Sequence, residues 1–319
     1  MTQKNKPNEL YITRIYNAPV EMVWDAWTDP EQVKQWWGPR GFSLTTHSKD
    51  LKPGRRWVYT MHGPDGVDYP NNTLYYEVET YRKLVYDHGA NENQPALFRV
   101  TVFFTEEKGK TKMEMTMSLE TPEAAEQIKK FIKQAGGNST WDRLAEYVDQ
   151  KTTGIDKFVI NRSFKTDVET LYNVWTQPEH IRQWLAPTGF NMTYLNSEIK
   201  AGSTVRYYMD GPNGLRMYGR AHYIELKKPE KIVYTQVFTD ANDNISRHPH
   251  APTWPETMLT TIELVQEDDQ HTRATITWEV YGQATQAEKD TFISARGGMT
   301  QGWTGSFDKL EYYLELQNK

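Results

Sequence analysis

The chain consists of two similar halves, and this duplication constrains its fold more than any other feature. When the sequence is shifted by 148 positions, residues 12–66 align with residues 160–214 without a gap, and 21 of the 55 aligned pairs are identical. A period near 150 residues is far longer than the unit of a solenoid, and it matches the size of one domain. We therefore predict two copies of one domain, over residues 1–151 and 156–319. The polar, glycine-containing stretch 150–157 is the predicted linker.

The two predicted domains begin alike. A strand at 10–16 in the first copy corresponds to 158–164 in the second. A proline then suits the first turn of a helix, and apolar residues recur at spacings of three and four. A second short helix is expected to carry Trp36 and Trp37. Stretches with a two-residue period follow and predict antiparallel strands. These stretches place Trp57, Tyr59 and Met61 on one face, and likewise Tyr76 with Val78.

A long helix is expected to close each copy. Thr121 suits a cap in the first copy, and Thr285 with Glu288 forms a capping box in the second. The pairs Gly136-Gly137 and Gly297-Gly298 are expected to kink or break this helix. A sheet that needs cover on one face, followed by a long helix, predicts an α+β fold. We expect two tandem helix-grip domains, each a curved antiparallel sheet wrapped around its C-terminal helix, with two short helices after the first strand.

Composition and charge exclude several functions. The 319 residues are 37 % hydrophobic and 25 % charged, and the formal net charge is −5. Neither half has the basic excess that binding to a phosphate backbone requires, so nucleic acid is not an expected partner. No apolar run approaches the roughly 18 residues of a membrane helix, and no signal peptide is recognisable. Without cysteine there is no disulfide framework. We expect a cytoplasmic protein with no membrane partner.

One stretch of each copy carries a family resemblance. In the first copy it runs from Ala18 to Glu31 and continues with Gln35-Trp-Trp and Pro39. The second copy repeats it through Val168, Trp175, Pro178-Glu179, Gln183-Trp184, Gly202 and Gly302-Trp303. These residues resemble the START-like (SRPBCC, helix-grip) superfamily, in the branch named for the C-terminal domain of the activator of heat-shock protein 90 ATPase. The two copies together cover nearly the whole chain.

The resemblance implies a cavity between the sheet and the C-terminal helix, which relatives use for lipids, hormones, polyketides or unknown ligands. We therefore expect a small apolar or aromatic ligand and no cofactor, because such sites are concave and mostly apolar. Co-chaperone activity is not implied, since it needs an additional N-terminal domain that neither copy resembles. The candidate wall residues are Trp36, Trp37, Trp57, Tyr59, Met61, Phe98, Met115, Trp184, Leu185, Val205, Tyr207, Met209, His222, Gln236 and Trp278.

The candidate wall residues also have a purely structural interpretation. Trp36 and Trp184 recur at equivalent positions and suit core packing of the short helices as well as a cavity wall. The strand stripe around Trp57 and Tyr59 forms the core of a filled domain or the wall of a hollow one. Methionines such as Met115 adapt to irregular shapes in either setting. The sequence leaves both interpretations open.

No catalytic residue is assigned by the sequence, and a binder is favoured over an enzyme. Nucleophile elbows, phosphate loops and dinucleotide fingerprints are absent. A cyclase- or hydrolase-like enzyme of the same superfamily would need a convergent polar set. Candidate sets are His88 with Tyr86 and Arg99, or Tyr207 with His222 and Gln236. A protein-interaction or stress-response module is the third alternative, although no sequence feature indicates a protein partner.

The insertion 239–257 in the second copy contains the sequence's best candidate for a metal site. His248 and His250 lie close together there, but no third histidine or carboxylate has ligand spacing. We therefore expect no metal site and interpret the segment as a solvated loop.

Overall fold

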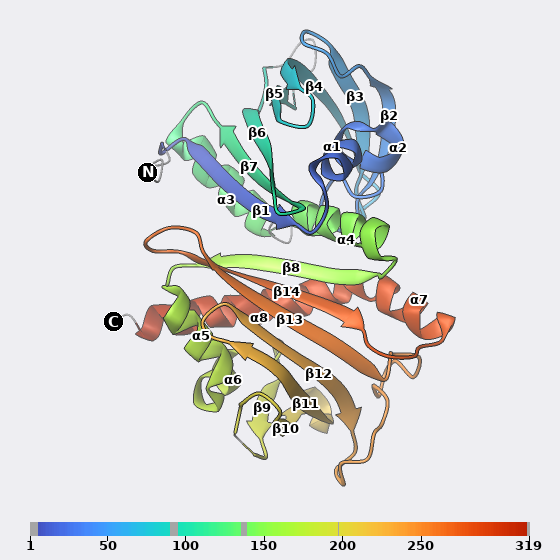
Figure 1. Cartoon of the computed structure of the whole chain (residues 1–319), viewed down its shortest axis with the longest axis vertical. Helices are drawn as coiled ribbons and strands as arrows, with labels where there is room; N and C mark the ends of the chain where they lie inside the picture. The colour runs from blue at the N-terminus through green and yellow to red at the C-terminus, as the bar shows by residue number, and fades with distance from the viewer. Residues whose placement is uncertain (1–5, 90–94, 135–138, 197, 318–319) are drawn as a thin grey trace. The chain divides into compact units, whose positions relative to one another are not determined.

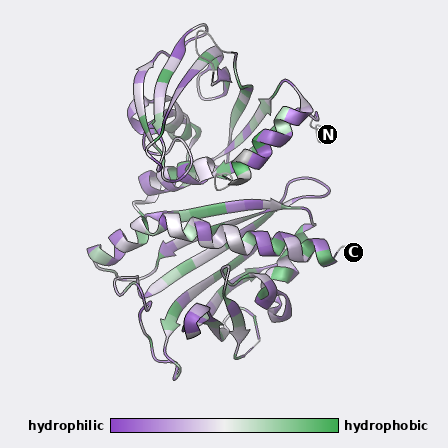
Figure 2. Ribbon diagram, turned by 180° about the vertical axis from the view of Figure 1, so that it is seen from behind, coloured by the Kyte–Doolittle hydropathy of each residue, from purple (hydrophilic) through white to green (hydrophobic). Residues whose placement is uncertain are grey.

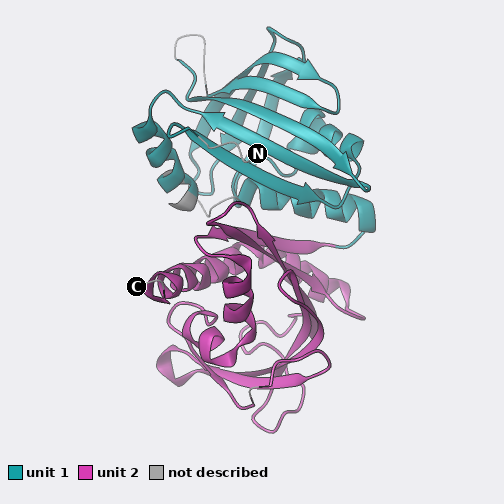
Figure 3. Cartoon of the chain, turned by 60° about the vertical axis from the view of Figure 1, so that its left-hand side comes forward, with its two compact units in different colours: residues 1–155 teal, residues 156–319 magenta. Residues whose placement is uncertain are grey.

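The chain folds into two compact units, drawn in different colours in Figure 3. Unit 1 spans residues 1–155 and unit 2 spans residues 156–319. The computed structural model describes residues 6–89, 95–134, 139–196 and 198–317. The connection between the units is shorter than predicted, because the last helix of unit 1 continues to Thr153 and the first strand of unit 2 begins at Lys157.

Unit 1 contains one seven-stranded antiparallel sheet with the strand order β1-β7-β6-β5-β4-β3-β2 (Figure 1). Its first strand therefore pairs with its last, and Leu10 lies opposite Met117. The elements in chain order are β1 (Glu9–Tyr16), α1 (Val20–Thr28), α2 (Pro30–Val33), β2 (Ser43–Lys49), β3 (Arg56–His62), β4 (Asp68–Glu79), β5 (Lys83–His88), β6 (Phe98–Glu107), β7 (Lys110–Ser118), α3 (Pro122–Gln134) and α4 (Ser139–Thr153).

Unit 2 repeats this topology with the strand order β8-β14-β13-β12-β11-β10-β9. Its first strand again pairs with its last, and Phe158 lies opposite Trp278. The elements are β8 (Lys157–Phe164), α5 (Val168–Thr176), α6 (Pro178–Trp184), β9 (Asn191–Tyr194), β10 (Thr204–Asp210), the short 3₁₀ turn η1 (Pro212–Gly214), β11 (Arg216–Lys227), β12 (Lys231–Thr239), β13 (Thr257–Gln266), β14 (Thr272–Val280), α7 (Gln286–Ser294) and α8 (Arg296–Gln317). The predicted tandem α+β helix-grip architecture is confirmed.

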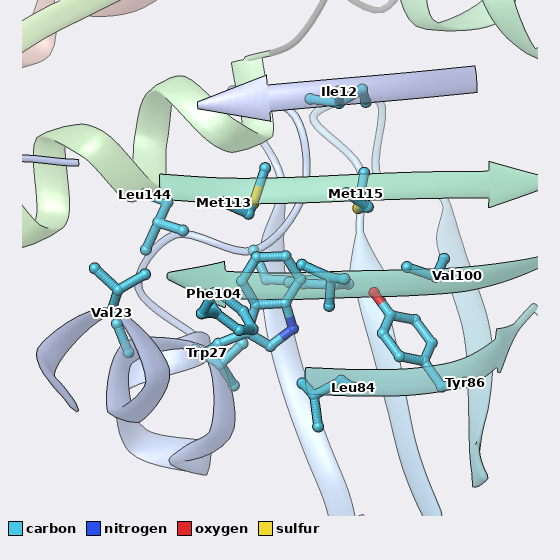
Figure 4. Close-up of a cluster of buried hydrophobic side chains, with 14 of the residues drawn as sticks. Ile12, Val23, Trp27, Leu84, Tyr86, Val100, Phe104, Met113, Met115 and Leu144 are labelled. Atoms are coloured by element: carbon cyan, nitrogen blue, oxygen red, sulfur yellow. The ribbon is translucent and has the colours of Figure 1, made fainter. Parts of the chain in front are cut away.

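Each sheet buries one face under the helices, which follows from the alternation of residue types along its strands (Figure 2). In β7 the methionines Met113, Met115 and Met117 are buried while the residues between them are not. Figure 4 shows Met113 and Met115 on the covered side of unit 1, together with Tyr86 of β5 and Trp27 of α1. Every second residue of these strands therefore belongs to the interior of its unit.

The short helices begin at the prolines and caps that the sequence indicates. Asp29 caps α2, because its carboxylate accepts hydrogen bonds from the backbone amides of Glu31 and Gln32 at 2.8 and 3.0 Å. Helix α2 ends at Val33, so the expectation that Trp36 and Trp37 lie on this helix is wrong. The equivalent helix α6 is longer and includes Trp184.

The closing helices confirm the predicted caps but not the predicted break in the second copy. The Thr121 hydroxyl accepts a hydrogen bond from the Ala124 amide, and Thr285 and Glu288 form the capping box. The break lies at Ala295, and the pair Gly297-Gly298 continues inside the first turn of α8. The corresponding pair Gly136-Gly137 lies outside the described residues.

A β-bulge occurs at the same place in both copies. It lies between Tyr75 and Glu77 in β4, and between Tyr223 and Glu225 in β11. Because a bulge adds one residue, side chains on its two sides change faces relative to a regular strand. Tyr75 is buried, Tyr76 and Glu77 are both exposed, and Val78 packs against the core again. The expectation that Tyr76 shares a face with Val78 is wrong for this reason.

Candidate functional site

Three tyrosines on neighbouring strands lie on the buried face of each sheet. In unit 1 they are Tyr59 on β3, Tyr75 on β4 and Tyr86 on β5, and each is at most 3 % exposed. Their equivalents in unit 2, at the same shift of 148 positions, are Tyr207, Tyr223 and Tyr234. We call each set a tyrosine triad. Both copies thus carry phenol groups inside an otherwise mostly apolar interior.

Burial keeps the phenols of both triads protonated. It raises the pKa of Tyr207 to about 12 and holds the pKa values of Tyr75 and Tyr223 well above the ordinary value. Mutual repulsion between the phenolates acts in the same direction. Tyr194 on β9 joins the triad of unit 2, with its ring centroid 6.2 Å from that of Tyr207. These hydroxyls are therefore neutral hydrogen-bonding groups at physiological pH.

The interior of unit 1 contains a continuous row of polar and aromatic side chains. The Lys49 amine lies 3.9 Å from the ring centroid of Trp57, and Trp57 stacks on Tyr59 with 4.1 Å between ring centroids. The Tyr59 hydroxyl lies 3.4 Å from Nδ1 of His88, whose ring stacks on Phe98 at 4.8 Å. The row connects the edge strand β2 with the central strand β6.

His88 occupies the most unusual position in this row. It lies at the end of β5, and burial of the imidazole lowers its pKa to about 4. In the sheet register Thr73 lies opposite both Trp57 and His88, on the same face. Thr73 is 1 % exposed, and its buried hydroxyl faces the Tyr59 phenol. Burial raises the pKa of that phenol and the Thr73 hydroxyl lowers it, although the two groups form no hydrogen bond of good geometry. Unit 1 thus brings a neutral imidazole, a phenol and an unpaired hydroxyl together.

Unit 2 has a different set of side chains on the same framework. Val205 replaces Trp57, Ala221 replaces Thr73 and Gln236 replaces His88. The Tyr207 ring packs flat against the backbone of Gly219, where an added Cβ would lie 2.7 Å from the phenol oxygen. Unpaired polar atoms are present here too. They are the Trp278 indole Nε1, which is buried without a hydrogen-bond partner in the described part of the unit, and the Thr260 hydroxyl, which faces Tyr234 without forming a hydrogen bond of good geometry.

Trp36 and Trp184 are core residues that hold the short helices together. Both are fully buried, and their indole nitrogens donate hydrogen bonds to the carbonyls of Ala26 and Val174 at 2.9 and 3.3 Å. Trp37 lies nearer to the row, with its ring centroid 5.2 Å from that of Trp57. The equivalent of Trp37 is Leu185, which packs partly buried against the core of unit 2.

Two residues proposed for polar sets lie on the opposite face of the sheet. His222 is exposed and hydrogen-bonds Thr204 on the outer surface, so the expectation that it lines the interior is wrong. Leu226 is partly buried, and regular alternation from Leu226 back to His222 would place His222 on the covered face. The bulge after Tyr223 interrupts this alternation, so His222 lies on the outer face. Arg99 pairs with Asp87 and stacks over Tyr76, also outside. Neither residue can complete a set with His88 or Tyr207.

The remaining candidate residues lie on the covered faces. Gln236 and Met258 are opposite each other in the sheet, and Trp278 lies between Thr260 and Phe158. In unit 1 the remaining candidates are Met61, Phe98 and Met115. In unit 2 the remaining candidate on β10 is Met209, two residues after Tyr207 in this strand. The sequence interpretation missed Tyr75, Tyr194, Tyr223 and Tyr234. The identical pairs at the shift of 148 positions were a signal that could have found three of them, since only Tyr194 lacks a tyrosine at the corresponding position.

The described residues contain no group of three or more histidines and carboxylates that could hold a metal ion. His248 of the insertion instead packs edge-on against Phe238. A shallow hollow of about 340 Å³ lies along α3, lined by Pro122, Glu123, Glu126, Gln127 and Lys130. It is formed by one helix alone and is separate from the tyrosine triads. None of the described helices is long and apolar enough to cross a membrane.

Comparison with known proteins identifies the family. The model of the family described as "Activator of Hsp90 ATPase homolog 1-like protein" matches residues 17–149 and, separately, residues 165–315. The chain belongs to this family. Each match lies within one unit, so the Activator of Hsp90 ATPase homolog 1-like domain occurs twice in tandem. No curated protein matches the sequence.

Solved structures similar to this chain include single-domain and two-domain proteins. A protein from Staphylococcus epidermidis is 28 % identical over 47 % of this chain and 95 % of its own, with a TM-score of 0.42. Protein Ms6760 from Mycobacterium smegmatis is 17 % identical over 50 % of this chain and 90 % of its own, with a TM-score of 0.42. The di-domain ARO/CYC BexL from the BE-7585A biosynthetic pathway is 11 % identical over 96 % of this chain and 98 % of its own, with a TM-score of 0.39.

Proposed function

We propose that the protein is a tandem binder, in which each unit holds one small apolar or aromatic molecule between the covered face of its sheet and its last helix. The observation that carries this proposal is the set of buried polar atoms without partners on that face. An unpaired buried hydroxyl or indole nitrogen costs about 1–3 kcal/mol. A ligand that hydrogen-bonds these atoms would remove this cost in the bound state.

The positions of the unpaired atoms support a ligand in each unit. In unit 1 the Thr73 hydroxyl lies on the same face as the triad, and in unit 2 the Thr260 hydroxyl and the Trp278 indole do so. The surrounding side chains are aromatic or aliphatic. A mostly apolar wall with a few polar groups that fix orientation is typical of small-molecule sites.

The chemistry of these groups indicates what such a ligand carries. An indole nitrogen only donates hydrogen bonds, and a protonated phenol donates one as well. We therefore expect an apolar molecule with at least one acceptor, such as a carbonyl or ether oxygen. The cytoplasm remains the compartment expected from the sequence.

Native mass spectrometry of the freshly purified full-length protein tests the proposal first, by detecting any co-purified molecule. Titration with an environment-sensitive apolar dye then counts sites. Ala221→Trp fills the interior of unit 2, because Ala221 is buried between Val205 and Gln236 in the sheet. His222→Trp is its matched control, since the same ring is added one residue away on the outer face.

We expect two dye equivalents for the wild type and for His222→Trp, and one for Ala221→Trp. Thr73→Trp should remove the other equivalent, and circular dichroism checks that each variant is folded. Equal dye stoichiometry in the wild type and both interior variants would contradict the proposal. So would the absence of both dye binding and a co-purified molecule.

A further inference from the structure

We propose that unit 1, and not unit 2, catalyses proton transfer on a bound carbonyl compound that has an acidic C–H next to the carbonyl, with His88 as the base and Tyr59 as the proton donor. This inference rests on the proposed function, because the compound must first occupy the interior of unit 1. It adds an activity to what is otherwise a binding site.

The geometry of His88 supports its role. Its Nδ1 atom lies 3.4 Å from the Tyr59 hydroxyl oxygen, and Nε2 has no hydrogen-bond partner among the described residues. Stacking on Phe98, with an interplanar angle of 19°, fixes the plane of the imidazole. With the proton on Nδ1 donated to the Tyr59 oxygen, the lone pair of Nε2 is free to accept a proton.

Tyr59 is suited to the complementary task. It is fully buried, and burial keeps its hydroxyl protonated. When its oxygen accepts from His88, its own O–H can donate to the carbonyl oxygen of the ligand. A donor aimed at an oxygen that gains negative charge stabilises the enolate-like transition state.

The proton transfer balances without any further reactant. The C–H bond next to the carbonyl breaks, its proton moves to Nε2 of His88, and its electron pair forms the C=C bond of the enol. The proton on Nδ1 passes to Tyr59 while the Tyr59 proton passes to the former carbonyl oxygen. The proton on Nε2 then exchanges with solvent, and the reverse transfers restore the ketone: Nε2 returns a proton to carbon, the enol oxygen returns its proton to Tyr59, and Tyr59 returns one to Nδ1. The net result is exchange of that hydrogen with solvent.

The duplication supplies an internal comparison. Unit 2 keeps the phenol, Tyr207, but has Gln236 where unit 1 has His88. The amide nitrogen of Gln236 has no basic lone pair such as the imidazole nitrogen offers, so unit 2 has the donor without the base. The unpaired hydroxyl of Thr73 beside His88 is also absent from unit 2, where Ala221 takes its place. The two units thus share a scaffold and differ at the reacting groups.

Hydrogen–deuterium exchange of 1-indanone in D₂O, followed by proton NMR with the full-length protein, tests the proposal. Saturable quenching of tryptophan fluorescence measures binding of the same ketone separately. The wild type should accelerate exchange over buffer, and His88→Gln should slow the protein-catalysed rate about 10²-fold or more, as expected for removal of a general base. Tyr59→Phe should also slow it, because the donor is lost while the ring remains.

His222→Gln is the control for histidine in general, because His222 lies on the outer surface, and it should exchange at the wild-type rate. Binding of 1-indanone without acceleration would overturn the catalytic proposal and leave the binding proposal intact. Full activity in both His88→Gln and Tyr59→Phe would overturn it as well. If 1-indanone bound equally to the wild type and to Thr73→Trp, both the occupancy of unit 1 and the catalysis would be refuted.

Discussion

Lys49 is a half-buried lysine whose amine is largely desolvated. Its amine donates a hydrogen bond to the Trp27 carbonyl at 3.0 Å, near the end of α1, and lies over the Trp57 ring. Burial lowers the pKa of this amine to about 7, although Asp29 acts in the opposite direction. The hydrogen bond from Lys49 to the Trp27 carbonyl therefore holds the end of α1 in place, and forming it requires desolvation of the ammonium group.

This pKa predicts a specific dependence of stability on pH. Between about pH 7 and pH 10.5 the unfolded chain holds a proton on Lys49 that the folded chain lacks, so the free energy of unfolding rises with pH. Lys49→Met removes this contribution. We expect the stability difference, wild type minus variant, to grow by about 1–2 kcal/mol between pH 6.5 and pH 9.5. Urea unfolding at both pH values measures it, and a difference that does not change with pH would contradict the prediction.

The tryptophans of the short helices give a second prediction. Trp36→Ala and Trp184→Ala should each cost about 3–5 kcal/mol, the usual range for deletion of a buried large aromatic ring. Tyr312→Ala is the control, because this ring is 63 % exposed and should change stability by less than about 0.5 kcal/mol. Denaturant unfolding gives the comparison. A loss below about 1 kcal/mol at either tryptophan would show that its ring does not contribute to the core.

Which site residues could be predicted from sequence depends on the strand bulges. The inward face of β3 follows from simple alternation, so Trp57 and Tyr59 were predicted correctly to share it. In β4 and β11 a bulge interrupts the alternation. As a result Tyr75 on β4 was missed, and His222 on β11 was predicted to lie on the wrong face. A single inserted residue reverses every face beyond it. No residue type marks the bulge, so its position becomes visible only in the hydrogen-bond register.

A basic side chain of the last helix of each unit donates hydrogen bonds to the loop after the second short helix, beside further contacts such as Arg40 with Glu146 in unit 1 and Ser306 with the Leu185 carbonyl in unit 2. In unit 1 the Arg143 guanidinium donates hydrogen bonds to the carbonyls of Gly38, Pro39 and Phe42 at 2.9, 2.9 and 3.1 Å. In unit 2 Lys309 donates to the carbonyl of Ala186 at 2.5 Å. Arg143 and Lys309 are equivalent in the aligned C-terminal segments. The contact therefore belongs to the shared domain.

Removal of this contact should destabilise unit 1. Hydrogen bonds from a charged donor contribute about 1.5–3 kcal/mol, so Arg143→Met should lower the free energy of unfolding by an amount in this range. Arg143→Lys should recover part of the loss, as unit 2 uses a lysine. The control is Arg82→Met, because Arg82 forms only an exposed ion pair with Glu79 and should have little effect. Equal unfolding midpoints for Arg143→Met and Arg82→Met would refute the prediction.

At the level of elements, the sequence predicts most of the order and only part of the boundaries. The caps at Thr121 and Thr285 are local signals and are found where expected. The end of α2 is not a local property. One further helical hydrogen bond runs from the Trp37 amide to the Val33 carbonyl, and Arg143, more than a hundred residues away in sequence, binds the carbonyls of Gly38 and Pro39 that follow. Tertiary contacts of this kind set boundaries that propensity alone does not show.

The two units should fold independently. Each has a complete sheet and a separate hydrophobic core, and the core residues of one cluster all precede those of the other in sequence. We expect fragments 1–155 and 156–319 each to give a cooperative thermal unfolding transition by circular dichroism. The first fragment ends beyond α4, so its closing helix is intact. Aggregation or lack of structure in both fragments would show that the copies depend on each other.

The units differ in where their large aromatic side chains lie. Trp57 and Trp37 in unit 1 correspond to Val205 and Leu185 in unit 2, so ring volume is missing near β10, the equivalent of β3. Unit 2 instead has Trp278 on β14, where unit 1 has Met117 at the corresponding sheet position. One stack is common to both units: a tryptophan of the last helix lies on the tryptophan of the first short helix, Trp141 on Trp27 at 5.1 Å and Trp303 on Trp175 at 5.9 Å between ring centroids. The duplicated interiors thus have different shapes on one framework.

The pairing of the first strand with the last has a consequence for how the chain acquires its structure. Leu10 and Met117 are more than a hundred residues apart, so the closing step of each sheet has high contact order and is expected to be slow. Strand β8 repeats Ile12 and Arg14 of β1 as Ile160 and Arg162, which makes it a competitor for the edge of β7. During synthesis β1 and β7 have both left the ribosome before β8, with α3 and α4 between β7 and β8, whereas refolding from denaturant offers β7 two similar partners at once.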